Sequence, residues 1–186
     1  MKSLTIRAAL FAVLLTTAAC RAVTTPFPAP DVEGMAPVPY TAAQIRENHP
    51  DGTETEMARS KDGVVYERSH TLFTDVTPEK VKLVITRTDA DGAPLGDPAE
   101  YTATWAELRS HAFFPAESTD LGHARVRVAA GTYDCWTYAV HADEGSNTVR
   151  TFYFAVDEPG PPVLLVTESD GVEVDRLEMT IDGRRG

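Results

Sequence analysis

The strongest constraint on the fold is a two-residue alternation of apolar and polar side chains along residues 53–182. It is clear in Leu177, Met179 and Ile181, which alternate with charged or polar residues. A period of two is typical of strands that bury one face. Turn-forming pairs such as Asp91-Gly92 separate the alternating segments. We expect about nine strands, near residues 53–60, 63–74, 81–89, 97–103, 123–129, 132–141, 148–156, 163–169 and 172–182.

The short links between these segments predict an antiparallel meander, because parallel strands need long crossovers. Two short helices are also expected. Thr41 and Gln44 form one capping-box pair, and Thr104 and Glu107 form another. The first helix should end by residue 49, and the second near residue 111 or 112. So large a sheet must curl to cover its apolar face. The predicted fold is therefore mainly β, a curved antiparallel half-barrel around the second helix, with a β-sandwich as the alternative.

The first nineteen residues have the composition of an export signal. Lys2 and Arg7 precede a short apolar run at 8–15, and small residues follow it. The apolar run is too short for a stable membrane span. We therefore assign 1–19 to a signal peptide.

Cys20 follows two alanines, which resembles the lipobox of bacterial lipoproteins, although Thr17 replaces the favoured leucine. This resemblance implies cleavage before Cys20, acyl chains such as palmitate on its thiol, and attachment to a membrane of the cell envelope. Arg21, rather than aspartate, follows the cysteine, which in Gram-negative sorting implies the outer membrane. The alternative is ordinary cleavage nearby, which would release an unanchored protein.

Residues 20–39 contain five prolines after the cysteine and predict an extended tether. Residues 40–186 then form a single β-rich domain. The chain carries 28 acidic and 17 basic residues, a net charge of −11. A surface of that sign repels phosphate backbones, so nucleic acid is not an expected partner.

The C-terminal half carries a second resemblance. Its strands run through Val126–Tyr138, Thr151–Ala155 and Pro159–Val163 and end in a hairpin at Thr167–Leu177. This order, over about residues 122–182, resembles uncharacterised periplasmic and lipoprotein domains similar in fold to the Lol lipoprotein carriers. The resemblance implies a curved half-barrel around a short helix, with an apolar concavity that can hold acyl chains. It implies no catalytic residue.

Five aromatic side chains are candidates for lining such a concavity. Trp136 and Tyr138 share one face of their strand, Phe152 and Phe154 share a face of the next, and Trp105 lies on the second helix. Aromatic residues fill a core as readily as they line a ligand cavity. The sequence leaves both readings open.

No motif predicts a catalytic site, a metal site or a cofactor. Cys135 lies in a strand among aromatics and is expected to be a packed, inert thiol. Asp89 and Asp91 lack the remaining ligands of a calcium loop. The histidines, none of which shows a metal-binding spacing, are His49, His70, His111, His123 and His141.

The combined expectation is a lipid-anchored envelope protein, not an enzyme. It would bind an acyl chain or another apolar ligand, or present a surface to envelope proteins. A structural or assembly protein without a cavity is the first alternative. A hydrolase is the second, and it would require His, Asp or Glu side chains clustered beside a cleft.

Overall fold

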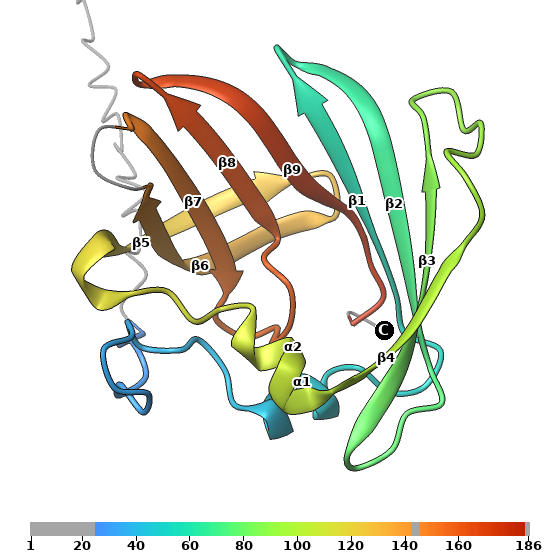
Figure 1. The fold of residues 1–186 in the computed structure, drawn as a ribbon, viewed down its shortest axis with the longest axis horizontal. Coiled ribbons are helices and arrows are strands. Elements are labelled where there is room, and N and C mark those ends of the chain that lie inside the picture. Colours follow the sequence, from blue (N-terminus) through green and yellow to red (C-terminus); the bar gives the residue numbers. More distant parts are fainter. Residues whose placement is uncertain (1–24, 143–145, 185–186) are drawn as a thin grey trace, which may run out of the picture.

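The computed structural model describes residues 25–142 and 146–184, so the predicted signal peptide and Cys20 lie outside it. Nine antiparallel strands form one open sheet, which confirms the predicted curved sheet (Figure 1). The sandwich alternative is wrong, because all nine strands belong to a single sheet. The strands are β1 (Glu54–Lys61), β2 (Val64–Thr74), β3 (Lys80–Thr88), β4 (Ala99–Thr104), β5 (Thr119–Val128), β6 (Gly131–His141), β7 (Thr148–Ala155), β8 (Leu164–Ser169) and β9 (Val172–Asp182).

Two meanders meet at the centre of the sheet, whose order is β4-β3-β2-β1-β9-β8-β7-β6-β5. The first meander runs outward from β1, and the second returns to β9, which pairs with β1. The chain must therefore pass from one edge, β4, to the other edge, β5. This connection carries α2 (Trp105–Ser110) and the short 3-10 helix η1 (Ala116–Ser118) across the concave side of the sheet (Figure 1).

Both helices begin as predicted. Thr41 caps α1 (Ala42–Glu47), and Thr104 caps α2, each through a complete capping box with the residue three positions later. The reciprocal bonds satisfy backbone N–H groups that a helix start leaves unpaired. The two helices contact each other and close one end of the half-barrel (Figure 1). No helix among the described residues is long and apolar enough to cross a membrane.

Residues 25–39 differ from the extended tether that the prolines suggested. Ala36 and Val38 are buried in the main apolar cluster, and Phe27 packs against it. The amide of Ala36 donates to the carbonyl of Phe114, and Met35 forms a β-bridge with Pro115. The prolines do prevent a helix, but the apolar residues between them give the segment a face that packs on the sheet. This segment is therefore part of the domain.

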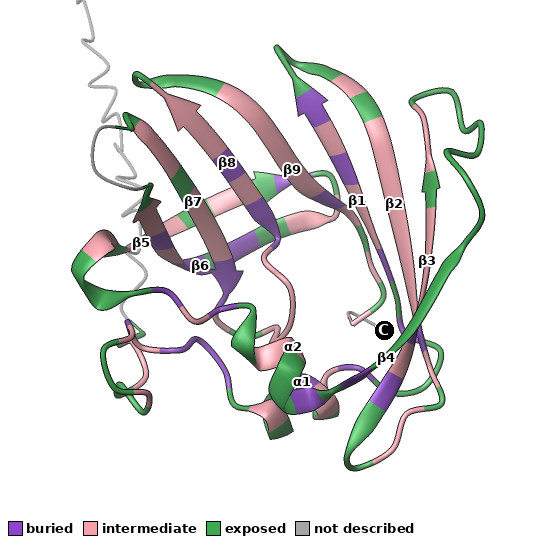
Figure 2. Ribbon diagram, viewed as in Figure 1, coloured by how far each residue is buried: buried purple, intermediate pink, exposed green. Residues whose placement is uncertain are grey.

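Two apolar clusters lie on opposite faces of β7. Phe154 faces the concave side and belongs to the main cluster with the two helices. Tyr153 and Ala155 face the other way, into a second cluster formed with β6 and β8. The amide of Ala130, in the β5–β6 turn, donates to the carbonyl of Met179 in β9, so that hairpin folds behind the sheet. Figure 2 shows the buried residues concentrated toward the helix end of the strands, while the hairpin tips are exposed.

Candidate binding pocket

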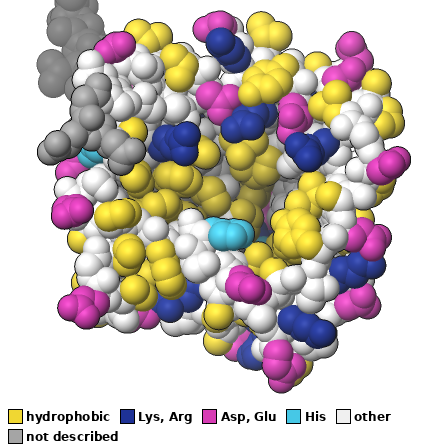
Figure 3. All heavy atoms as spheres, in the orientation of Figure 1, with side chains coloured by type: hydrophobic (Ala, Val, Ile, Leu, Met, Phe, Trp, Pro, Cys, Tyr) yellow, Lys and Arg dark blue, Asp and Glu magenta, His cyan; other side chains and the backbone are white. Residues whose placement is uncertain are grey.

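A pocket of about 290 Å³ lies between the concave face of the sheet and the two helices. This volume is at the lower end of the range for small-molecule sites, about 300–1,000 Å³. Figure 3 shows apolar side chains gathered around a hollow on this face. The lining residues are Val38, Pro39, Tyr40, Ile45, His49, Thr55, Met57, Thr71, Phe73, Leu83, Ile85, Tyr101, Leu108, Arg109, His111, Ala112, Phe152, Phe154, Gly160, Pro161 and Pro162.

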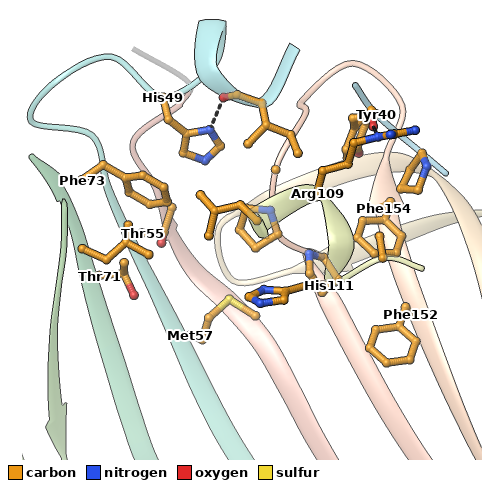
Figure 4. A pocket seen from close by; sticks show the side chains of 18 of the residues that line it. Tyr40, His49, Thr55, Met57, Thr71, Phe73, Arg109, His111, Phe152 and Phe154 are labelled. Atoms are coloured by element: carbon orange, nitrogen blue, oxygen red, sulfur yellow. Dashed lines mark hydrogen bonds between the residues drawn. The ribbon is translucent and has the colours of Figure 1, made fainter. Parts of the chain in front are cut away.

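The lining follows from the alternation in the strands. Phe73 of β2 lies opposite Leu83 of β3, and Thr71 lies opposite Ile85, so all four side chains share the concave face. Figure 4 shows Thr71 and Phe73 on one side of the space and Phe152 on the other. The apolar character of the pocket is thus built into the registers of adjacent strands.

The structure brings the five sequence-predicted aromatics into one cluster on the concave side. Trp105, Trp136, Tyr138 and Phe154 are buried there, and Phe152 packs against them. Phe152 and Phe154 line the pocket, whereas the other three do not. The predicted lining is therefore divided between a filled part and a hollow part of the same cluster.

The N-terminal segment explains why Trp136 and Tyr138 lie outside the pocket. The indole N–H of Trp136 donates to the carbonyl of Thr25 at 3.1 Å, and the hydroxyl of Tyr138 donates to the carbonyl of Pro37 at 2.7 Å. The ring of Phe27 lies edge-on to Tyr138, with centroids 5.8 Å apart. Residues 25–39 therefore cover these two aromatics. Trp105 is held separately, by donation from its indole N–H to the carbonyl of Thr77.

His49 is the most unusual side chain of the lining, because it is fully buried. Its Nδ1–H donates to the carbonyl of Ile45 at 2.7 Å, which leaves Nε2 as an acceptor (Figure 4). Among the described residues, Nε2 has no hydrogen-bond partner. Burial lowers the pKa of His49 to about 4, so the ring is neutral at pH 7. The pocket thus contains a buried, unsatisfied acceptor.

A buried ion pair lies behind His49. Arg184 binds Asp182 through two nitrogen–oxygen contacts of 2.6 and 2.8 Å, and both side chains are almost fully buried. A side chain at Gly160 would come within 2.5 Å of the His49 ring and 2.7 Å of Arg184, so only glycine fits there. The loop at 160–162 can therefore press closely on His49 and form one wall of the pocket.

Arg109 is the cation of the lining, and two of its three side-chain nitrogens are bound within the described residues. Its Nε donates to the carbonyl of Tyr40, and its terminal nitrogen pairs with Asp31 of the N-terminal segment. The guanidinium also lies 5.4 Å from the ring centroid of Phe113. Arg109 thus ties α2 to the N-terminal segment, and this role does not require a ligand.

Most of the side chains that line the pocket are apolar. The described lining contains two histidines but no carboxylate, serine or cysteine. Cys135 is buried in the second cluster, as expected, and burial raises the pKa of its thiol to about 12. No group of three or more His, Cys, Asp or Glu side chains among residues 25–142 and 146–184 is placed to hold a metal ion.

Sequence reasoning missed several lining residues, and a signal existed for some of them. The alternation of Leu83 and Ile85 marked one face of β3, which is the face that lines the pocket. For His49 there was no such signal. It lies just after α1, and tertiary contacts with Phe73 of β2 and with Gly160 bury it.

Comparisons with known proteins identify no family. No protein-family model matches the chain. No curated protein matches it either. A chain in the complex of Pseudomonas aeruginosa MucA and MucB is 13% identical with a TM-score of 0.48, and the match covers 75% of this chain and 54% of that one. A Bacteroides fragilis protein with a YmcC-like fold is 9% identical with a TM-score of 0.47, covering 72% and 96%. MucB alone is 14% identical with a TM-score of 0.48, covering 75% and 55%. This chain thus spans about half the length of the MucB structures, and likenesses this distant assign no function.

Proposed function

We propose that this protein is a non-catalytic binding module of the bacterial envelope that holds an acyl chain or another apolar ligand in the concave pocket. One observation carries the proposal. The half-barrel leaves about 290 Å³ unfilled beside its main apolar cluster, between the concave face of the sheet and the two helices. Apolar surface that faces water is unfavourable. An apolar ligand in this half-open pocket would remove the lining from water and would contact it directly.

The predicted acyl anchor on Cys20 belongs to the same proposal. Thr25, the first described residue, already contacts the sheet through its carbonyl, which accepts bonds from His123 and Trp136. Five residues span at most about 17 Å. An anchored Cys20 would therefore hold the domain close to the membrane surface, within reach of lipids, and not tens of ångströms away.

The test uses a chain with Cys20→Ser, so that its own acyl chains cannot enter the pocket. We expect it to enhance the emission of an apolar fluorescent probe. Thr71→Trp, which projects a large ring into the pocket, should abolish most of this signal. Leu72→Trp, on the opposite face of the same strand, should retain it. Absence of probe binding by the folded Cys20→Ser chain would contradict the proposal.

A second candidate function rests on the open edges of the sheet. β4 and β5 each pair with one strand, so each leaves a row of backbone groups that a partner strand could bind. An assembly protein of the envelope would use such an edge. Recovery of a stoichiometric protein partner after mild cross-linking, together with no probe binding, would favour this function over ligand binding.

A further inference from the structure

Three arginines lie on the concave face one pleat beyond the pocket lining. Arg59 follows the lining residue Met57 on β1, and Arg87 follows Ile85 on β3, each two positions toward the hairpin tips. Residues two apart on a strand point to the same face and are about 7 Å apart.

The third arginine has the same relation to the pocket. Arg150 precedes the lining residue Phe152 by two positions on β7, a strand that runs from the hairpin-tip end toward the helices. Figure 3 shows Lys and Arg side chains along the border of the apolar hollow that lies away from the helices. We name Arg59, Arg87 and Arg150 the arginine row.

The strand registers confirm the shared face. Arg59 lies opposite Leu177 of β9. Leu177 lies opposite Leu165 of β8, and Leu165 lies opposite the pocket residue Phe152. Cross-strand partners project from the same side of a sheet. Arg87 lies opposite Ser69, which lies opposite Met57 of the pocket. The arginine row and the apolar lining thus belong to one continuous surface.

The three arginines differ in whether they already have an acidic partner. Arg59 pairs with Asp175 at 3.1 Å. Arg87 and Arg150 are exposed, and neither forms an ion pair within residues 25–142 and 146–184. The acids that share this face, by the same alternation, are Glu67 and Asp175. The row therefore gives this face a local excess of positive charge in a chain whose net charge is −11.

We propose that the ligand is a single-chain amphiphile with an anionic headgroup, whose chain enters the pocket and whose headgroup binds at the arginine row. This inference rests on the proposed function and narrows its ligand class. The volume of the pocket suits one chain and not several. Arginine binds carboxylate and phosphate through paired N–H groups, so both headgroups share the required chemistry.

The experiment measures displacement of the apolar probe from the Cys20→Ser chain by undecanoate, decanol and decyl phosphate. All three carry the same ten-carbon alkyl chain beyond the headgroup, and decanol lacks the charge. In a purely apolar site decanol would bind best, because a carboxylate is costly to desolvate. We expect undecanoate or decyl phosphate to displace the probe at a concentration about tenfold lower than decanol does, since hydrogen bonds to charged groups are the stronger ones.

Substitutions then test whether the arginine row causes the preference for the anionic ligands over decanol. Arg87→Gln with Arg150→Gln should remove the advantage of the anionic ligands and leave decanol unchanged. Arg127→Gln, which alters an exposed arginine in the β5–β6 hairpin that folds behind the sheet, should preserve that advantage. Whichever anion displaces the probe at the lower concentration identifies the headgroup as carboxylate or phosphate.

The outcomes separate the two proposals. Equal displacement by decanol and both anions, or a preference that survives the double substitution, would overturn the anionic headgroup and leave the apolar pocket standing. Absence of probe binding before any competitor is added would remove the proposed function, and with it this inference.

Discussion

The two faces of β7 carry similar side chains but lie in different environments. Tyr153 and Ala155 belong to a cluster that residues of the β5–β6 hairpin pack against. Phe152 and Phe154 face a space that the helices cover only in part. The same strand therefore contributes to a packed core and to a hollow one. Apolar residues on a strand show that a face is covered, and the elements that cross that face decide whether room remains.

The largest expected effect concerns the boundary between these two regions. Arg184 contacts the sulfur of Met179 on the filled side and lies beside the Gly160 wall of the pocket. Arg184→Met would leave the Asp182 carboxylate buried without its cation, at a cost of about 3–5 kcal/mol in the free energy of unfolding. Urea denaturation measures this. Arg127→Met, on an exposed site, should change stability by less than about 0.5 kcal/mol. If Arg184→Met lowered the free energy of unfolding by no more than Arg127→Met does, the boundary would not depend on the ion pair.

The second prediction concerns pH and the hollow side. The pKa of His49 is about 4 in the folded protein and about 6.5 in the unfolded chain. The unfolded chain therefore binds more protons between these values, so stability is full above pH 6.5 and falls as the pH drops toward 4. The expected loss is about 3 kcal/mol.

Urea unfolding across this pH range measures the effect, and the difference from His49→Phe isolates it. The free energy of unfolding of that variant should not show the fall between pH 6.5 and pH 4 that is due to His49. NMR titration of the folded protein should place the His49 ring midpoint near 4; a midpoint near 6.5 would contradict the tight packing of the ring.

The third prediction compares overpacking on the two sides. Ala155→Ile inserts three carbons into the filled cluster, where it should cost about 1–3 kcal/mol. Thr71→Ile points into the pocket, where space is available, and should change stability by less than about 1 kcal/mol. Thermal and urea unfolding of both variants test the contrast. Equal costs would mean that the pocket is as tightly packed as the second cluster.

The smallest expected effect concerns the N-terminal segment. Asp31 pairs with Arg109, but about half of the Asp31 side chain is exposed. Asp31→Asn should therefore reduce stability by less than about 1 kcal/mol. Phe27→Ala should cost more, since the ring of Phe27 packs on the main cluster. Urea unfolding of both variants decides whether charge or apolar contact holds the segment; a larger loss for Asp31→Asn would favour charge.

Local patterns predicted the strands and helices well, because turns, alternation and capping boxes act over a few residues. The boundaries of β7 and β9, for example, fall within one residue of those expected. The pairing of β1 with β9 had no local signal, since it joins the first strand of the chain to the last. The packing of residues 25–39 was missed for a related reason: five prolines dominated a segment whose apolar residues between them find partners far along the chain.

The sequence predicted the aromatic character of the candidate site but not which residues line it. The five aromatics do lie together, yet the sequence could not divide them between filling and lining, because both tasks use the same side chains. His49 depends on Gly160 and Arg184, which are more than a hundred residues away. The signal peptide and the lipidation of Cys20 stay predictions, since those residues lie outside the described part of the chain.

The sequence alone determined a mainly β chain with two capped helices and one apolar face, because alternation and capping are local properties of adjacent residues. The tertiary structure decided where that face stays hollow, which aromatics the N-terminal segment covers, and that three arginines from separate strands border the pocket. Those features depend on strand register and on contacts between distant segments, which no local pattern specifies.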